Sequence, residues 1–279
     1  MNSSYLLSIV TFIYALGAFL YLAAWVFQRE SVARPARWVT ILALLGNTAG
    51  IIWRWVESYQ LGIGHAPFSN LYESLVFFAW TIGVLYLWLE YRHQVRIVGA
   101  FATPLAFLPL AYASLSPGIS SSITPLIPAL KSNWLIAHVI TCFFGYAAFA
   151  VAFGISLMYL IKLLDPQGRS RVLGVFPVHR TLDELTYQMV IFGFLFLTVG
   201  IITGSVWANS AWGSYWSWDP KETWSLITWF VYAALIHARM MRGWQGKRIA
   251  YLSILGFAAV IFTYFGVNYL PGLHSYAQT

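Results

Sequence analysis

Tryptophan is concentrated in one short stretch of the sequence. Six of the 14 Trp residues fall between positions 207 and 229, and four of them are predicted to share one connection between helices: Trp207, Trp212, Trp216 and Trp218. Trp is enriched at both membrane interfaces, which accounts for about one or two residues at each helix end and not for four in one connection. Exposed indoles would form an apolar patch of the kind that normally marks a binding surface. The stretch therefore predicts a platform for a large, flat, apolar ligand.

Asp219 and Pro220 follow this stretch and are typical of a helix start. Asp is a favoured N-cap residue, and Pro is favoured at the first helical position. Asp219 and Glu222 would also lie at the positive end of the helix dipole, where carboxylates are stabilising. Capping alone therefore explains Asp219, while a role in orienting a ligand or a histidine stays open.

Three of the six His residues are candidate ligands: His138, His237 and His274. A coordinating residue inside a membrane span is costly and indicates function, although a hydrogen-bonded position between helices is the simpler explanation for any single one. We predict that His138 and His274 meet beside the Trp-rich stretch. His237 is predicted to lie about 21 Å from the outer end of its own helix, in the cytoplasmic half of the membrane. Two imidazoles and an aromatic platform suit a six-coordinate haem, whereas zinc would require three or four ligands. A second haem, with its other ligand from elsewhere, would account for His237.

The remaining polar candidates have simpler explanations. Three histidines are predicted in loops, with solvated or structural roles: His65, His93 and His179. Cys142 lies one helical turn from His138 and is interpreted as a small core residue. Arg54 and Lys131 are cations that could pair with haem propionates. Glu73 is unusual at the outer end of a span and is predicted to face the site.

The composition indicates the class of protein that positions these residues. Of 279 residues, 59% are hydrophobic and 9% are charged, whereas a soluble domain carries about 25% charged residues. The net charge is +7, but the basic residues form short clusters between apolar runs, which argues against nucleic acid as a partner.

The single cysteine excludes an internal disulfide and CxxC chemistry. The N-terminus has no basic region, which favours a retained span over a cleaved signal peptide. The sequence therefore predicts an integral membrane protein.

Eight apolar stretches are long enough to cross about 30 Å of hydrocarbon. They are Tyr5–Phe27, Trp38–Val56, Leu71–Leu89, Val98–Leu115, Asn133–Leu163, Leu185–Val206, Thr223–Met241 and Ile249–Leu270. Pro104 and Pro109 interrupt the fourth stretch and are expected to kink it. The predicted fold is all-α and polytopic, a single transmembrane domain over residues 1–279 with an external loop at about 207–222.

The distribution of Lys and Arg between the loops indicates how the chain is oriented in the membrane. Thirteen of the sixteen basic residues fall in or beside one set of alternate connections, and Arg54, Lys131 and Lys221 belong to the other. Cytoplasmic loops carry the excess of Lys and Arg, so the first set is predicted to be cytoplasmic. Both termini and the Trp-rich stretch then lie on the opposite, extracytoplasmic side.

Five ordered motifs extend these features to nearly the whole chain. They are PFSNLYES at Pro67–Ser74, WLIAHV at Trp134–Val139, WANSAWGSYWSWDPKETW at Trp207–Trp224, HARM at His237–Met240 and GVNYLPGLHSY at Gly266–Tyr276. Together they resemble the ResC/CcsA-type subunit of the System II cytochrome c synthetase, a haem-handling membrane protein with a WWD domain. The resemblance covers residues 65–276, and the first 60 residues add two predicted spans.

The resemblance implies roles for particular residues. His138 and His274 would ligate a haem b on the external side, and His237 would provide one ligand of a haem within the membrane. The WWD stretch would hold the haem edge: Trp207, Trp212, Trp216, Trp218, Asp219 and Trp224. In this family the second histidine ligand of the haem bound by His237 comes from a ResB-type subunit. Here a separate ResB-type chain would have to supply that histidine.

The resemblance also implies a function and a location. The chain would be one component of a cytochrome c haem lyase, incomplete without its ResB-type partner. It would take haem b as substrate and ligand, move it across the membrane and present it to the CxxCH motif of apocytochrome c. We expect a multi-pass protein among the lipids of a bacterial inner membrane, active on its periplasmic face. No catalytic acid, base or nucleophile is assigned.

Two alternatives remain open. A System I WWD protein would pass haem to a carrier chaperone, although eight spans and the GLHSY tail favour System II. A dihaem electron-transfer subunit or a transporter would belong to another class. Dihaem bundles usually place two histidines on one helix, and no predicted span contains two.

Overall fold

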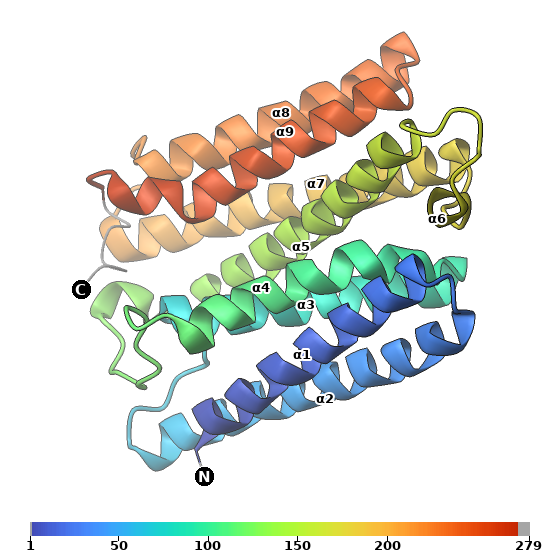
Figure 1. The fold of residues 1–279 in the computed structure, drawn as a ribbon. Coiled ribbons are helices and arrows are strands. Elements are labelled where there is room, and N and C mark those ends of the chain that lie inside the picture. The colour runs from blue at the N-terminus through green and yellow to red at the C-terminus, as the bar shows by residue number, and fades with distance from the viewer. Residues whose placement is uncertain (1, 273–279) are drawn as a thin grey trace. The chain divides into compact units, whose positions relative to one another are not determined.

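Helices form all the regular structure of residues 2–272, the part of the chain that the computed structural model describes (Figure 1). The long helices are α1 (Ser3–Val26), α2 (Glu30–Gln60), α3 (Leu71–His93), α4 (Gly99–Leu115), α5 (Asn133–Lys162), α7 (His179–Trp212), α8 (Pro220–Arg242) and α9 (Lys247–Tyr264). Shorter elements are α6 (Arg171–Gly174) and the 3₁₀ turns η1 (Arg96–Val98), η2 (Pro128–Leu130) and η3 (Gly266–Tyr269).

Seven of the described helices are long and apolar enough to cross a membrane. The eighth long helix, α8, has 23 residues, but His237, Arg239 and several Trp and Thr residues lower its hydropathy. The prediction of an all-α, polytopic membrane protein is confirmed. The predicted orientation of the termini stays a prediction.

The predicted interruption of α4 and the predicted end of α7 differ from the structure. Helix α4 continues through Pro104 and Pro109 without interruption, since a helix among other helices in a membrane tolerates prolines. Helix α7 runs to Trp212, six residues beyond the predicted end at Val206, and stops at Gly213, whose φ of +76° suits the residue after a helix C-terminus.

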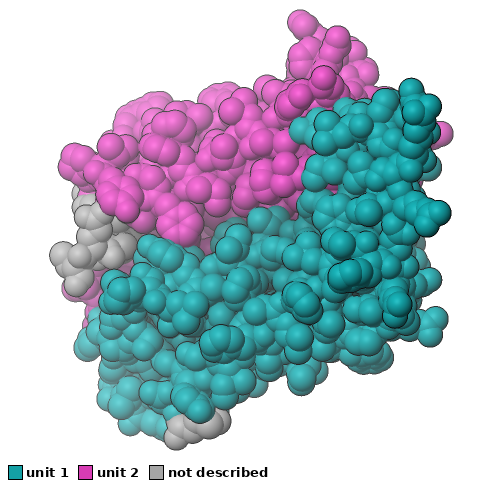
Figure 2. Space-filling model, in the orientation of Figure 1, with its two compact units in different colours: residues 1–125, 160–179 teal, residues 126–159, 180–279 magenta. Residues whose placement is uncertain are grey.

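The chain divides into two compact units, coloured separately in Figure 2. Unit 1 comprises residues 1–125 and 160–179, and unit 2 comprises residues 126–159 and 180–279. Unit 2 carries the predicted haem-ligating histidines and the Trp-rich stretch. The single transmembrane domain over residues 1–279 stays a prediction.

Helices α5 and α7 of unit 2 approach each other at small residues. A Cβ atom on Gly193 would lie 3.0 Å from the carbonyl oxygen of Gly145, and one on Gly200 would lie 2.6 Å from Sγ of Cys142. Small residues allow helix backbones to pack closely within a membrane. This approach places the first turns of α5, which carry His138, directly against α7.

Candidate functional site

His138 faces the last turns of α7. Its Nδ1 lies 2.8 Å from the carbonyl oxygen of Gly200. Because a carbonyl can only accept a hydrogen bond, Nδ1 carries the proton and the lone pair lies on Nε2, the nitrogen that could act as a ligand. A Cβ atom on Gly204 would lie 2.5 Å from Nδ1, so the ring fits only against a glycine. The backbone of α7 therefore orients His138 as metal-ligating histidines are usually oriented.

Trp207 forms one wall of this site. Its ring stacks on His138 with the centroids 5.8 Å apart and the planes at 18°, and its Nε1 donates to the carbonyl oxygen of Ala129 at 2.8 Å. Leu130 and Leu135 pack against the same indole, which is 2% exposed. Trp212 meets it edge-on at 4.9 Å. We refer to His138, Trp207, Gly200 and Gly204 as the His138 site.

The placement of Trp207 and Trp212 corrects one prediction. Both were expected in a connection, but they lie on the last two turns of α7, and the connection comprises only residues 213–219. Gly213 is the first helix-terminating residue after Val206, so the helix continues as far as Trp212. Trp207 is consequently part of a helix and buried.

The connection itself presents Trp216 and Trp218. Their rings meet edge-on at 5.7 Å and 89°. Trp218 is 69% exposed and has a φ of +59°, a strained conformation for a non-glycine residue. The buried Nε1 of Trp216 has no hydrogen-bond partner among residues 2–272. A buried donor of this kind is costly unless a ligand or water satisfies it.

Asp219 is the N-cap of α8, as predicted. Its Oδ1 accepts from the backbone N–H of Lys221 at 2.9 Å, and Oε2 of Glu222 accepts from the N–H of Asp219 at 3.3 Å, which completes a capping box. The same Glu222 oxygen accepts from the N–H of Ser217 at 2.7 Å. Hydrogen bonds of the cap therefore hold the connection of residues 213–219 against the start of α8.

We predict that Asp219→Ala lowers the free energy of unfolding by about 1 kcal/mol through loss of the cap. Asp219→Asn retains a capping oxygen and should be nearly neutral. Thermal unfolding in detergent, followed by circular dichroism at 222 nm, compares the two variants. An equal loss in both would show that the charge of Asp219, and not its cap, is what matters.

Trp224 is directed toward α9. Its ring packs on Phe262 at 4.2 Å between centroids, and its carbonyl oxygen accepts from Oγ1 of Thr263 at 3.2 Å. Trp224 thus contributes to packing between α8 and α9.

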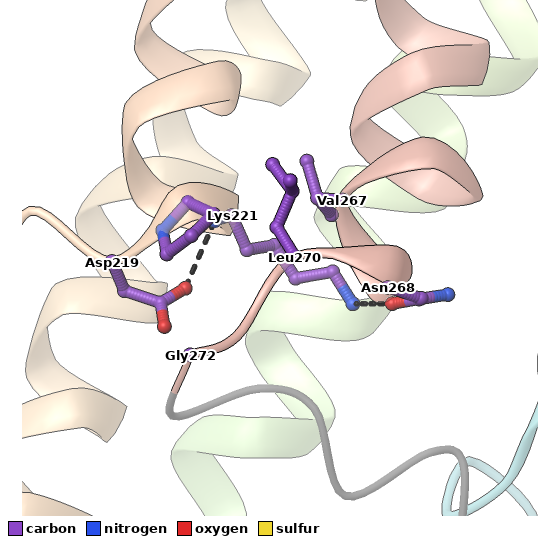
Figure 3. Close-up of a pocket in the computed structure, with 7 residues that line it drawn as sticks. Asp219, Lys221, Val267, Asn268, Leu270 and Gly272 are labelled. Carbon is purple, nitrogen blue, oxygen red and sulfur yellow. Dashed lines mark hydrogen bonds between the residues drawn. The ribbon is translucent and has the colours of Figure 1, made fainter.

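A small pocket lies at the start of α8. Its empty volume is about 160 Å³, and its lining includes Asp219, Lys221, Asn268 and Gly272. In Figure 3 the Lys221 side chain reaches toward Asn268, and Nζ donates to Oδ1 at 3.3 Å. This volume is below that of pockets for drug-sized ligands, about 300–1,000 Å³, so haem cannot lie inside it. The predicted ligand His274 lies outside the described residues.

His237 lies on the exposed face of α8. The opposite face is buried and comprises Thr228, Tyr232, Leu235 and Ala238. Oγ1 of Thr228 lies 2.9 Å from Oγ1 of Thr263, and Tyr232 closely approaches Gly256 of α9. His237 therefore points away from the α8–α9 pair.

Other sequence candidates have structural roles within unit 1. Arg54 and Glu73 pair with each other at 2.8 Å, with side chains 2% and 1% exposed. His65 is buried, and its ring nitrogens lie 2.8 Å and 3.0 Å from the carbonyl oxygens of Ala66 and Thr124. The carboxylate of Glu73 is turned to Arg54, and that Glu73 faces the site stays a prediction.

Cys142 is buried in unit 2, as predicted, and its Sγ lies 3.6 Å from Nδ1 of His138. Lys131 is exposed. Within residues 2–272, no three His, Cys, Asp or Glu side chains are grouped closely enough to hold a metal ion. An iron that arrives inside a porphyrin needs only axial ligands from the protein, and the orientation of His138 fits that requirement.

Comparisons with known proteins agree with this architecture. Residues 68–274 match the cytochrome c assembly protein family. The chain is 42% identical to the cytochrome c biogenesis protein CcsA of Guillardia theta, over 85% of this chain and 83% of that protein. It is 42% identical to the CcsA of Prochlorococcus marinus strain NATL2A, over 97% and 93%.

A solved structure has a similar fold. The cytochrome c heme lyase CcmF superposes with a TM-score of 0.72 at 18% identity, over 95% of this chain. The chain spans about half, 47%, of CcmF. The family match and the identities to its relatives show that the chain belongs to the cytochrome c assembly protein family, as a CcsA-type membrane protein of cytochrome c biogenesis.

Proposed function

We propose that this chain binds haem b as its substrate, moves it across the membrane and presents it for covalent attachment to the CxxCH motif of apocytochrome c. It does so with a ResB-type membrane subunit, in a bacterial inner membrane, with the attachment site on the extracytoplasmic side. The chain and its partner together form the haem lyase.

The geometry of His138 carries this proposal. Its tautomer is set by Gly200, its ring is held by Trp207, and Nε2 is the nitrogen that would ligate iron. The orphaned Nε1 of Trp216 and the exposed ring of Trp218 supply a donor and an apolar surface on the same connection. We assign His274 as the second axial ligand. Gly272, two residues earlier, lies against Asp219, where a Cβ atom would have no room.

The exposure of His237 supports a ligand supplied in trans. If α8 crosses the membrane as proposed, a histidine on its outward face would be costly in contact with lipid alone. A haem between His237 and a histidine of the ResB-type subunit would satisfy both rings. In the proposed path, haem passes from this position to the His138 site.

The attachment needs no nucleophile from this chain. Each cysteine thiol adds across one vinyl double bond, so that a carbon–sulfur bond forms and the thiol hydrogen passes to the other vinyl carbon. No oxidant or reductant is consumed. The contribution of the protein is to position the vinyl groups and to control the ligation of the iron.

Haem spectra of the purified chain test the proposal. Wild type, His138→Ala, His274→Ala and His237→Ala are prepared with and without a co-expressed ResB-type partner, and reduced spectra are recorded. We expect either external variant to lose the bis-histidine spectrum of one haem and to regain it with added imidazole. His237→Ala should lose the other haem, which should be present only with the partner. A haem-free wild type, even with the partner, would refute the proposal.

The same preparations distinguish the System I alternative. A wild-type chain that passes its haem to a carrier chaperone, and forms no complex with a ResB-type subunit, would establish that alternative instead. Attachment of haem to a CxxCH peptide by the complex, and not by the chain alone, is the expected result.

A further inference from the structure

Asp183, near the start of α7, is a buried carboxylate that holds two groups of the α8–α9 hairpin. Its Oδ2 accepts from Nη1 of Arg239 at 2.7 Å, and its Oδ1 accepts from the backbone N–H of Gly246 at 2.7 Å. The side chains of Asp183 and Arg239 are 9% and 11% exposed. Hydrogen bonds between charged groups are about twice as strong as neutral ones. We call Asp183, Arg239 and Gly246 the Asp183 clamp.

Two further contacts hold Arg239 against α7. Its Nη2 lies 3.2 Å from Oε2 of Glu184, whose side chain is 55% exposed. The guanidinium carbon lies 4.3 Å from the centroid of the Tyr187 ring. Asp183 is thus the buried partner of the guanidinium and Glu184 the solvated one. The α8–α9 turn is equally constrained, because a side chain at Gly246 would collide with Tyr159.

The clamp determines the direction of the neighbouring histidine. Successive residues of an α-helix are rotated by about 100°, so His237 and Arg239 point about 200° apart around α8. With Arg239 held on α7, His237 must project from the opposite side, where it is exposed. The clamp acts in the last turn of α8, which ends at Arg242, within two residues of His237.

We propose that Asp183 is a positioning residue for His237: through Arg239 and Gly246 it sets the rotation of the last turn of α8, and so aims the imidazole out of this subunit toward the haem. This inference rests on the proposed function, in which His237 ligates a haem shared with the ResB-type subunit. Asp183 touches neither the haem nor the ligand opposite His237.

The test compares Asp183→Asn with Glu184→Gln. Both substitutions remove one carboxylate that faces Arg239, but only the first removes the buried one. Each is made in a His138→Ala chain, where the remaining haem is bound through His237, and is purified with the ResB-type partner. We expect Asp183→Asn to lower haem per complex about tenfold, because a charged hydrogen bond contributes enough for that factor. Glu184→Gln should stay within about twofold of its parent.

Added imidazole separates mispositioning from collapse of the pocket. A misdirected His237 leaves the porphyrin space intact, so imidazole should restore the six-coordinate spectrum of Asp183→Asn. In the chain with an intact His138, haem added to the purified Asp183→Asn complex in detergent should still fill the His138 site, which then does not depend on delivery through His237. A complex that takes up added haem at neither site would have a general folding defect, and this result would overturn the proposal.

The remaining outcomes are also decisive. Equal haem in Asp183→Asn and Glu184→Gln, at the level of the parent, overturns the clamp and leaves the proposed function standing. A parent complex without this haem refutes the proposed function at His237, and the clamp with it.

Discussion

Replacing Gly204 with alanine is expected to remove most of the haem bound through His138. The new Cβ atom would lie 2.5 Å from Nδ1 and 2.7 Å from Cε1 of the imidazole, well inside van der Waals contact. The ring must rotate or move away, which breaks the hydrogen bond to Gly200 and the stacking on Trp207. Overpacking of this kind costs about 1–3 kcal/mol, and we expect haem in the external site to fall about tenfold or more.

Reduced spectra of the purified complex measure this effect. Gly118→Ala is the control, because nothing lies within 4 Å of a Cβ atom placed there and the residue is exposed. Haem bound through His237 should be unchanged in both variants. If Gly204→Ala retains its external haem at the level of Gly118→Ala, the ring orientation observed for His138 is not the one that binds haem.

Replacing Glu73 with glutamine is expected to destabilise the protein by about 3–5 kcal/mol, as removal of one partner from a buried ion pair does. Oε1 of Glu73 accepts from Nε of Arg54 at 2.8 Å, and both side chains are almost fully buried. The same guanidinium donates to the carbonyl oxygens of Ser121 and Ser122 at 2.9 Å and 3.1 Å. Without the carboxylate, a buried cation remains among neutral acceptors.

Glu30→Gln is a matched control for this prediction. Glu30 also pairs with an arginine, at 2.7 Å from Nη1 of Arg96, but its side chain is 77% exposed. Exposed pairs contribute at most about 1 kcal/mol. Thermal unfolding in detergent should therefore show a large loss for Glu73→Gln and almost none for Glu30→Gln. Similar losses would mean that burial does not make the Arg54 pair important.

The approximate positions of the long helices could be predicted from hydropathy alone, although only seven of the eight are apolar enough to count as candidate spans. Helices α1, α3 and α5 begin within two residues of the predicted stretches. A helix end could be predicted where residues with a strong preference for that position occur. Asp219 and Pro220 are such residues at the start of α8. The end of α7 was missed because a hydropathy pattern stops where apolar residues stop, whereas the helix continues until Gly213 terminates it.

The Trp-rich stretch shows the same division between composition and geometry. Its unusual composition predicted a binding region, a prediction that stays open, and the structure gives its indoles different surroundings. Trp207 is buried against His138, Trp218 is exposed, and Trp224 packs on α9. The role of each Trp depends on which residues of other helices pack against it, and those residues lie outside the Trp-rich stretch.

Ion pairs between residues far apart in the sequence could not be predicted either. Arg54 and Glu73 are 19 residues apart and were considered separately, Arg54 as a partner of haem propionates and Glu73 as a residue facing the site, yet they pair with each other. Asp183 and Arg239 are 56 residues apart, and no local pattern connects them. Burial makes the loss of one partner of such a pair costly, and burial becomes known only once the helices are packed.

Composition, hydropathy and the ordered motifs were therefore sufficient for the class of protein, its helices and its candidate ligands, because those properties depend on residues close together in the chain. The direction in which each ligand points was decided by tertiary structure. His138 turns to α7 because Gly200 and Gly204 leave room and an acceptor there. His237 turns outward because Arg239, on the other side of the helix, is held by Asp183. Rotation about a helix axis leaves hydropathy unchanged, so only contacts between helices can set it.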